Sequence, residues 1–343
     1  MKMKAKTIIA GISSAICLAL SGTLHAGTLN GAGATFPAPL YQQWISEYTK
    51  ISGGVKINYQ AVGSGAGLAQ IRAKTVDFGA SDEPLKKEEL DKDGMIQFPM
   101  TMGAIVPVVN LPDIKPGELK LTGPVLAKIF MGQITVWNDP EVSKINEGLK
   151  LPDMKITVVH RADGSGTTWN FTNYLSKVSE DWSKKFGCAK EIAWIEGTVG
   201  GQKNAGVAAM VKRIKGAIGY VESAYAFESK MTYTQMQNKD GKFVQPDNDS
   251  FQAAAENADW KNAPGFYMVL TDQAGEKSWP IMASTYILIY KSQPDKEKID
   301  SLLKYYTWCY DSGANLAKKL NYVPMPKNVV DLVKEAWQKN LTK

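Results

Sequence analysis

The chain has few of the residues that hold transition metals or form disulfide bonds. Its 343 residues include three cysteines and two histidines, and one of each falls within the first 26 positions. The remaining Cys188, Cys309 and His160 show none of the spacings of a zinc or iron site. We therefore expect no metal site and no cofactor. Cys188 and Cys309 could pair in an oxidising compartment or stay free, and their positions in the chain do not decide between these alternatives.

The sequence also lacks a hydrophobic run long enough to cross a bilayer comfortably. The apolar stretch Ile8 to Leu20 is short and is interrupted by glycine and serine. Three lysines precede it, and the segment ends at the small residue Ala26. This is the pattern of a cleavable signal peptide over residues 1–26, so we expect a soluble mature protein outside the cytoplasm. Cys17 would suggest a lipid anchor, but the bulky Ile16 stands where lipoprotein signals have a small residue.

No dense cluster of positive charge is present. The whole chain has a formal net charge of +6, and because three lysines and no acidic residue lie in the leader, the mature chain carries +3. The lysine pairs at 184–185 and 318–319 are typical of solvated helix faces rather than of a surface that follows a phosphate backbone. We expect no binding to nucleic acid.

The signatures of common catalytic sites are missing too. There is no Walker A loop and no His-Glu-x-x-His motif, and Asp163 replaces the first glycine of a Gly-x-Ser-x-Gly elbow around Ser165. His160 adjoins Arg161 on an expected strand, where neighbouring side chains point to opposite faces. We therefore expect His160 to face away from whatever Arg161 binds, and we predict that the protein is not an enzyme.

What the sequence does contain is an alternation of short apolar strands, small-residue turns and amphipathic helices, which is typical of α/β layers. Strands are expected within 29–36, 55–62, 76–80, 104–109, 156–159, 217–221 and 281–290. Helices are expected after residue 37, near 68–71, and over 85–90, 121–131, 142–149, 167–178, 207–212, 298–310 and 329–340. The polar, weakly patterned segment 228–265 is expected to be the most exposed part of the protein.

Two segments are expected to cross between two domains. The buried run 104–109 contains Pro107, which indicates an edge strand or a crossing. The strand-like run 281–290 is expected to cross back, because two amphipathic helices then close the chain. We therefore expect domain I to comprise residues 27–105 and 283–343, and domain II residues 106–282.

Three strand–turn–helix junctions place a hydroxyl at the start of a helix. These hydroxyls belong to Thr35, Ser64 and Ser165. Helix N-termini carry unpaired N–H groups and partial positive charge, so three of them together would surround a small tetrahedral anion with neutral donors. Arg161 could add a bidentate charged contact, and Asp163 could hold its guanidinium or could serve only the turn.

Asp82 follows the expected strand 76–80 and has two interpretations. It could be a simple cap before Pro84. In an anion pocket, however, a carboxylate is tolerated only if it meets a proton, which a hydrogen-bearing phosphate offers and fully ionised sulfate does not. Asp82 would then select phosphate over sulfate.

Four motifs identify a family resemblance that covers essentially the whole mature chain. They are Gly31-Ala-Gly-Ala-Thr-Phe-Pro-Ala-Pro39, Val76-Asp-Phe-Gly-Ala-Ser-Asp82, Arg161-Ala-Asp-Gly-Ser-Gly-Thr167 and Gly216-Ala-Ile-Gly-Tyr-Val-Glu222. In this order they resemble the periplasmic phosphate-binding proteins of bacterial phosphate ABC importers. The resemblance implies a type II periplasmic binding fold: two α/β domains with mixed central sheets, joined by two crossing segments, with one phosphate in the cleft between them.

The resemblance also implies roles for particular residues. Thr35, Phe36 and Ser64 would contact phosphate through hydroxyl and backbone N–H groups, and Asp82 would accept the phosphate proton. Arg161, oriented by Asp163, would be the charged donor, and the helix end at Ser165, Gly166 and Thr167 would complete the site. Two departures from the family pattern are visible: Gly65 and Ala66 stand where Ser-Gly is common, and His160 stands where a second arginine is common.

The function implied is capture of inorganic phosphate in the periplasm and its delivery to an inner-membrane ABC permease by a monomeric receptor. Alternatives from other classes are a secreted phosphatase-like enzyme that retains its product and a receptor that reports phosphate status to a sensor. The chain could also bind another tetrahedral oxyanion.

Overall fold

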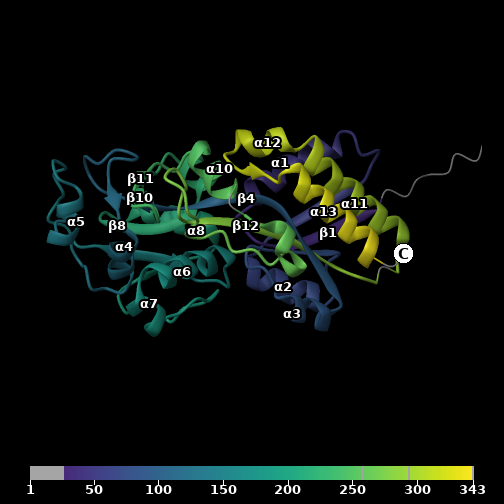
Figure 1. The fold of residues 1–343 in the computed structure, drawn as a ribbon, viewed down its shortest axis with the longest axis horizontal. Helices are drawn as coiled ribbons and strands as arrows, with labels where there is room; N and C mark the ends of the chain where they lie inside the picture. Colours follow the sequence, from purple (N-terminus) through teal and green to yellow (C-terminus); the bar gives the residue numbers. More distant parts are fainter. Residues whose placement is uncertain (1–26, 257, 293, 342–343) are drawn as a thin grey trace, which may run out of the picture.

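The computed structural model describes residues 27–256, 258–292 and 294–341. Its central element is a ten-stranded mixed sheet, and helices gather around the two ends of that sheet (Figure 1). The expected signal peptide, including Cys17, lies outside the described residues. Within the described ranges, no helix combines the length and the apolar character that a bilayer span requires.

One end of the molecule, which we call domain I, is built on parallel strands and the helices that follow them. Its strands are β1 (Thr28–Gly33), β2 (Lys56–Ala61) and β3 (Phe78–Ser81), with β1 paired in parallel to both others. Its helices are α1 (Ala38–Thr49), α2 (Ser64–Arg72), α3 (Lys87–Asp93), α11 (Lys296–Asp311), α12 (Ala314–Lys319) and α13 (Lys327–Asn340). Because parallel strands end at the same sheet edge, the three turns after β1, β2 and β3 come together.

The other end, domain II, repeats this design. Its strands are β6 (Thr157–Arg161), β7 (Val199–Gly201) and β8 (Ala217–Glu222), with β6 parallel to both others. Its helices are α4 (Gly123–Phe130), α5 (Pro140–Ile145), α6 (Gly166–Val178), α7 (Glu180–Lys185), α8 (Lys203–Arg213), α9 (Ser223–Glu228) and α10 (Asn248–Glu256). A small sheet of β5 (Lys120–Leu121), β10 (Gln235–Gln237) and β11 (Phe243–Val244) and the strand β9 (Thr232–Tyr233) complete it.

Two long strands join the domains. β4 (Met95–Val109) is buried along its whole length and pairs antiparallel with β12 (Met282–Tyr290), and Figure 1 shows both running through the middle of the molecule. β4 then continues into domain II, where it pairs with β8. β4 therefore runs from one domain into the other, with Pro107 on a central strand, whereas among the described strands β12 pairs only with β3 and with the first part of β4. Pro99, which cannot donate to a ladder, lies at a register shift between β4 and β12.

Apolar residues of both domains form a main hydrophobic core along β4, and two smaller buried clusters lie beside it. Part of the main core comes from the segment 228–265, where Met236 and Phe251 are fully buried and Trp260 is 4% exposed. The expectation that this segment is the most exposed part of the protein is therefore wrong. Its few apolar residues anchor short elements whose remaining side chains are polar, which hides the periodicity.

The two cysteines of the described chain are free thiols. Cys309 is buried on α11 in domain I, whereas Cys188 is exposed after α7 in domain II. The sequence left open whether Cys188 and Cys309 pair or stay free, and in the structure they form no disulfide.

Candidate functional site

The nine residues that the sequence singled out meet where the two domains face each other. The loops after β1, β2 and β3 supply one wall, and the turn after β6 with the start of α6 supplies the other. All of them except Asp163 are buried; they are Thr35, Phe36, Ser64 and Asp82 on domain I, and Arg161, Asp163, Ser165, Gly166 and Thr167 on domain II. A bound ion at this place would be shielded from bulk water, which strengthens its polar contacts.

Arg161 is the buried cation of the domain II wall. Its side chain is 1% exposed; Nε and Nη2 donate to the two carboxylate oxygens of Asp163 at 2.8 and 2.5 Å, and Nη1 donates to Thr167 Oγ1 at 3.3 Å. Burial opposes ionisation of Asp163, but the Arg161 guanidinium and the Lys203 N–H at 2.9 Å outweigh it and hold the pKa of this carboxyl below its usual value. Asp163 therefore orients Arg161, which was one of its two predicted roles.

The turn after Arg161 opens a helix end toward domain I. Ser165 Oγ accepts a hydrogen bond from the Thr168 N–H at 3.0 Å and so caps α6. The N–H groups of Gly166 and Thr167 lie in the first turn, where the helix itself offers them no acceptor. Together with the guanidinium they make this wall attractive to an anion.

Asp82 is the exceptional residue of the domain I wall. Its N–H donates to Ser64 Oγ at 3.2 Å, the Ser64 hydroxyl donates to Asp82 Oδ2 at 3.4 Å, and Oδ1 is buried without a hydrogen-bond partner. Burial raises the pKa of Asp82 to about 7, against the opposing influence of the Thr285 hydroxyl, Arg161 and Ser64. A buried carboxyl with an unpartnered oxygen suits a ligand that brings its own proton.

Asn204, at the start of α8, is a member of the site that sequence reasoning missed. Its side-chain amide Nδ2 lies 2.9 Å from Thr35 Oγ1 and 3.2 Å from Thr167 Oγ1, so it bridges hydroxyls of both walls. It is fully buried. The available signal was a fourth glycine-rich strand–turn–helix junction, between β7 and α8, which lacks a hydroxyl at the helix start and so did not match the other three.

The two walls touch directly in this structure. A Cβ at Gly166 would lie 2.6 Å from Ser64 Oγ and 2.7 Å from Asp82 Cβ. Gly63 has a φ of +99°, and a Cβ there would lie 2.6 Å from Asp163 Oδ2. The Gly65 N–H donates to the Gly164 carbonyl at 2.9 Å. The departure from the family pattern at Gly65 therefore falls where backbone meets backbone.

His160 faces away from the site, as expected. Its ring stacks on Trp194 with centroids 4.8 Å apart, and its Nδ1 lies 2.9 Å from the Arg161 carbonyl oxygen. Burial lowers the pKa of His160 despite this contact. Among the described residues, no group of three or more His, Cys, Asp or Glu side chains has a metal-binding arrangement.

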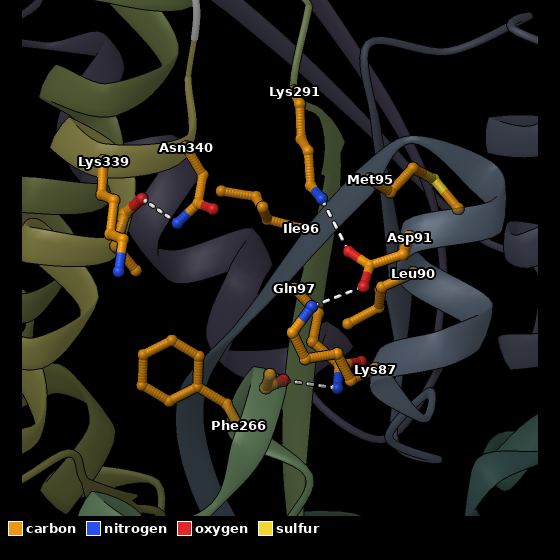
Figure 2. Close-up of a pocket in the computed structure, with 12 residues that line it drawn as sticks. Lys87, Leu90, Asp91, Met95, Ile96, Gln97, Phe266, Lys291, Lys339 and Asn340 are labelled. Carbon is orange, nitrogen blue, oxygen red and sulfur yellow. Dashed lines mark hydrogen bonds and ion pairs between the residues drawn. The ribbon is translucent and has the colours of Figure 1, made fainter.

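A separate hollow of about 240 Å³ lies on domain I between α3, the start of β4 and the end of α13 (Figure 2). Its lining is mainly apolar and includes Leu90, Ile96 and Phe266, and Lys291 and Lys87 at its rim both pair with Asp91. None of the predicted anion-binding residues lines it. The candidate anion site is therefore separate from this hollow.

Comparison with known proteins shows the family of this chain. Residues 21–312 match the model of the PBP superfamily domain. The phosphate-binding protein PstS of Xylella fastidiosa strain Temecula1 is 52% identical over 309 residues, which cover 90% of this chain and 84% of the relative. The PstS of Haemophilus influenzae is 49% identical over 323 residues, covering 93% and 96%.

Solved structures show the same fold. A high affinity periplasmic phosphate-binding protein, PfluDING, solved with bound phosphate, superposes with a TM-score of 0.71 at 20% identity and covers 90% of this chain and 93% of its own. A phosphate-binding protein from Stenotrophomonas maltophilia superposes with a TM-score of 0.71 at 19% identity, covering 90% and 94%. The type II periplasmic binding fold expected from the sequence is thus confirmed, and by the extent of its identity to the PstS proteins the chain belongs to the PstS family of phosphate-binding proteins.

Proposed function

We propose that this protein is a periplasmic receptor that encloses one inorganic phosphate ion between its two domains and delivers it to an inner-membrane ABC permease. Its relatives at about 50% identity are named phosphate-binding proteins. The single observation that carries the proposal is the pairing of an anion-attracting helix end and Arg161 on one wall with the unpartnered Asp82 oxygen on the other. We further propose that the receptor is a monomer, exported by the signal peptide, whose domain boundaries lie within β4 and at the start of β12.

Each residue has a proposed contact. Thr35 and Ser64 hydroxyls, the Phe36 N–H and the N–H groups of the α6 start would donate to phosphate oxygens, as would Arg161. Asp82 Oδ1 would accept the phosphate proton, which compensates its burial. Sulfate brings no proton at neutral pH, so its oxygen would lie against a desolvated carboxylate, and it is expected to bind much more weakly.

The proposed function requires binding without turnover. His160, the one histidine among the described residues, stacks on Trp194 on the opposite face of β6, so no imidazole is placed at the site to act as a general base. A bound ligand would therefore leave chemically unchanged when the domains open.

The test is an equilibrium titration of the purified protein after bound phosphate has been removed. Tight phosphate binding that a large excess of sulfate does not displace supports the proposal, whereas equal competition by sulfate overturns it. A chromogenic phosphomonoester is the matched control for catalysis, and turnover would favour the phosphatase alternative. Loss of phosphate uptake on gene deletion separates transport from sensing, because a sensor would leave uptake intact.

A further inference from the structure

The place where β4 passes from one domain to the other has an unusual arrangement of strands. β13 (Val323–Pro324) pairs with β4 at Met102, and β8 pairs with β4 from Ile105 onward. Because β12 occupies the opposite edge of β4, β13 and β8 lie end to end along the same edge. The gap between them, in which Gly103 of β4 lies, is the place where β4 leaves its domain I partner and meets its domain II partner.

Two side chains bridge this gap. Glu222 is the last residue of β8 in domain II, and Tyr322 directly precedes β13 in domain I. The Tyr322 hydroxyl oxygen lies 2.8 Å from Glu222 Oε2 and 2.7 Å from the Phe36 carbonyl oxygen. The Tyr322 and Phe36 rings also meet edge to face, and a Cβ at Gly103 would lie 2.9 Å from the Phe36 ring. The bridge thus ends on a residue of the proposed phosphate site.

The hydrogen bonds of this bridge depend on whether Glu222 carries a proton. The tyrosine hydroxyl has one hydrogen, and both the Phe36 carbonyl and an ionised Glu222 carboxylate can only accept. With Glu222 ionised, Tyr322 can therefore satisfy only one of them. With a proton on Glu222, the carboxyl donates to the Tyr322 oxygen and Tyr322 donates to Phe36, so both contacts are made. The Ser223 hydroxyl at 2.7 Å and the Ala224 N–H at 3.0 Å still donate to the carboxyl oxygens.

The surroundings of Glu222 favour the protonated form. The carboxyl is fully buried and has no ion pair with a cation in the described part of the chain. Titratable groups acting on it are Tyr322 beside it and Glu228 and Tyr225 from α9. From the site, Asp82 acts on both tyrosines and Arg161 acts on Tyr225. β4 faces it with apolar Ile105, and α8 offers the uncharged Asn204, whose Oδ1 accepts from the Glu222 N–H at 2.9 Å. Burial raises the pKa of Glu222 to about 8, and Glu228 adds to the rise.

We propose that Glu222 and Tyr322 form a hinge clasp: a pair of positioning residues, joined by one proton, that holds the Phe36 backbone in place and stabilises the closed arrangement of the domains. This inference rests on the proposed function, because phosphate binding is what closure would accompany. In an open form in which water reaches Glu222, the carboxyl would ionise near its ordinary pKa, so closure would take up a proton. Because closure must take up this proton, phosphate binding would weaken progressively as the pH rises from about 5 to about 8.

The experiment measures phosphate affinity and release rate for the stripped protein and three variants. Tyr322→Phe removes the hydroxyl but keeps the ring, and it is expected to weaken binding about 5- to 20-fold and to speed release. Glu222→Gln keeps a neutral donor, and at about pH 4, where Glu222 would carry its proton in both the open and the closed form, it is expected to stay within about twofold of the original chain. Tyr310→Phe is the matched control, because the Tyr310 hydroxyl also donates to a backbone carbonyl, that of Pro99 in β4, but makes no hydrogen bond to the described residues of domain II.

The pH profile separates a clasp from ordinary packing. The ionisation of phosphate and of Asp82 affects the original chain and the Glu222→Gln variant alike. The phosphate dissociation constant of the original chain, divided by that of Glu222→Gln, therefore isolates the contribution of Glu222. This ratio is expected to rise with pH up to about 8. A flat ratio overturns the proposal, and so does a Tyr322→Phe variant that binds like Tyr310→Phe. Should Tyr322→Phe fail to fold, the Glu222→Gln ratio alone decides. Failure of the original chain to bind phosphate would instead overturn the proposed function.

Discussion

The two walls of the cleft are built from the same strand–turn–helix unit, yet their charges are arranged in opposite ways. On domain II the cation Arg161 is already paired with Asp163 and is further contacted by Thr167. On domain I the carboxyl of Asp82 is desolvated, and one of its oxygens has no partner. One wall therefore satisfies its charge within the protein, whereas the other leaves its charge for the ligand to satisfy.

This difference indicates that affinity for an anion and selectivity between anions come from different parts of the site. A neutralised Arg161–Asp163 pair next to a carboxyl gives the site no net positive charge, so neutral donors at helix ends must supply most of the attraction. The unsatisfied carboxyl selects among anions by the proton that it demands. Variants of each wall should therefore fail in different ways.

The largest effect is expected from Arg161→Met on domain II. It removes three hydrogen bonds and leaves the Asp163 carboxylate partly buried without its cation, so phosphate affinity is expected to fall about 100-fold or more. Sulfate affinity should fall in parallel, because this wall does not distinguish sulfate from phosphate. Titration with both ions checks this, with Arg72→Met, which breaks the exposed pair with Asp93, as the control. A selective loss of phosphate alone would contradict the division of roles.

Asp82→Asn on domain I is expected to change selectivity more than affinity. An amide can donate to an unprotonated oxygen, so sulfate is expected to gain about tenfold or more on phosphate. Competition titrations measure this ratio, with Asp93→Asn as the control. An unchanged ratio would mean that Asp82 acts only as a cap.

The same variant has a consequence for stability. Because burial raises the folded-state pKa of Asp82 from 3.8 to about 7, the ligand-free protein is expected to lose stability as the pH rises from about 4 to about 7, by roughly 2–4 kcal/mol at most. Asp82→Asn should remove this part of the loss. Melting temperatures of the stripped proteins across that pH range test it; parallel profiles would contradict it.

Asn204→Ala is expected to produce an intermediate effect, because it cuts the contact that joins hydroxyls of both walls. Thr35 and Thr167 would keep their positions but lose a shared donor, and affinity for both anions is expected to fall about tenfold. Asn238→Ala, which removes a buried asparagine away from the cleft, is the matched control for folding. Equal affinities for the two variants would show that the bridge is dispensable.

The smallest effect is expected from Lys190→Ala. Lys190 of domain II pairs with Glu83 of domain I at 2.5 Å, but both side chains are partly exposed, at 30% and 19%. Exposed pairs contribute little and are screened by salt, so release is expected to speed up about twofold at low salt and not at high salt. Stopped-flow release rates test this against Lys184→Ala, whose pair with Glu180 stays within domain II. A salt-independent change would point to a packing role.

Much of the fold and most of the site could be predicted because local patterns reported them. The hydroxyls at Thr35, Ser64 and Ser165 stand at helix starts that apolar periodicity reveals, and in the structure the loops that carry them lie on the two facing walls. The pairing of Arg161 with Asp163 is local as well, since two positions on a turn separate them.

What could not be predicted depends on contacts between distant segments. Asn204 binds Thr35 across 169 positions and has no helix-capping pattern of its own. The burial of Phe251 depends on a segment 28 positions further along the chain, since its ring packs on Trp279 just before β12. Likewise, Glu222 reads as the end of a strand until Tyr322, 100 positions away, is placed beside it.

Gly166 has no side chain, and this makes it a position at which domain closure around phosphate can be changed without changing the fold of either domain. A methyl group there would meet Ser64 and Asp82 of the opposite wall only when the domains come together. Gly166→Ala should therefore block domain closure sterically while leaving the fold of each domain intact. Such a variant would supply a permanently open receptor with which to ask whether a permease distinguishes an empty carrier from a loaded one.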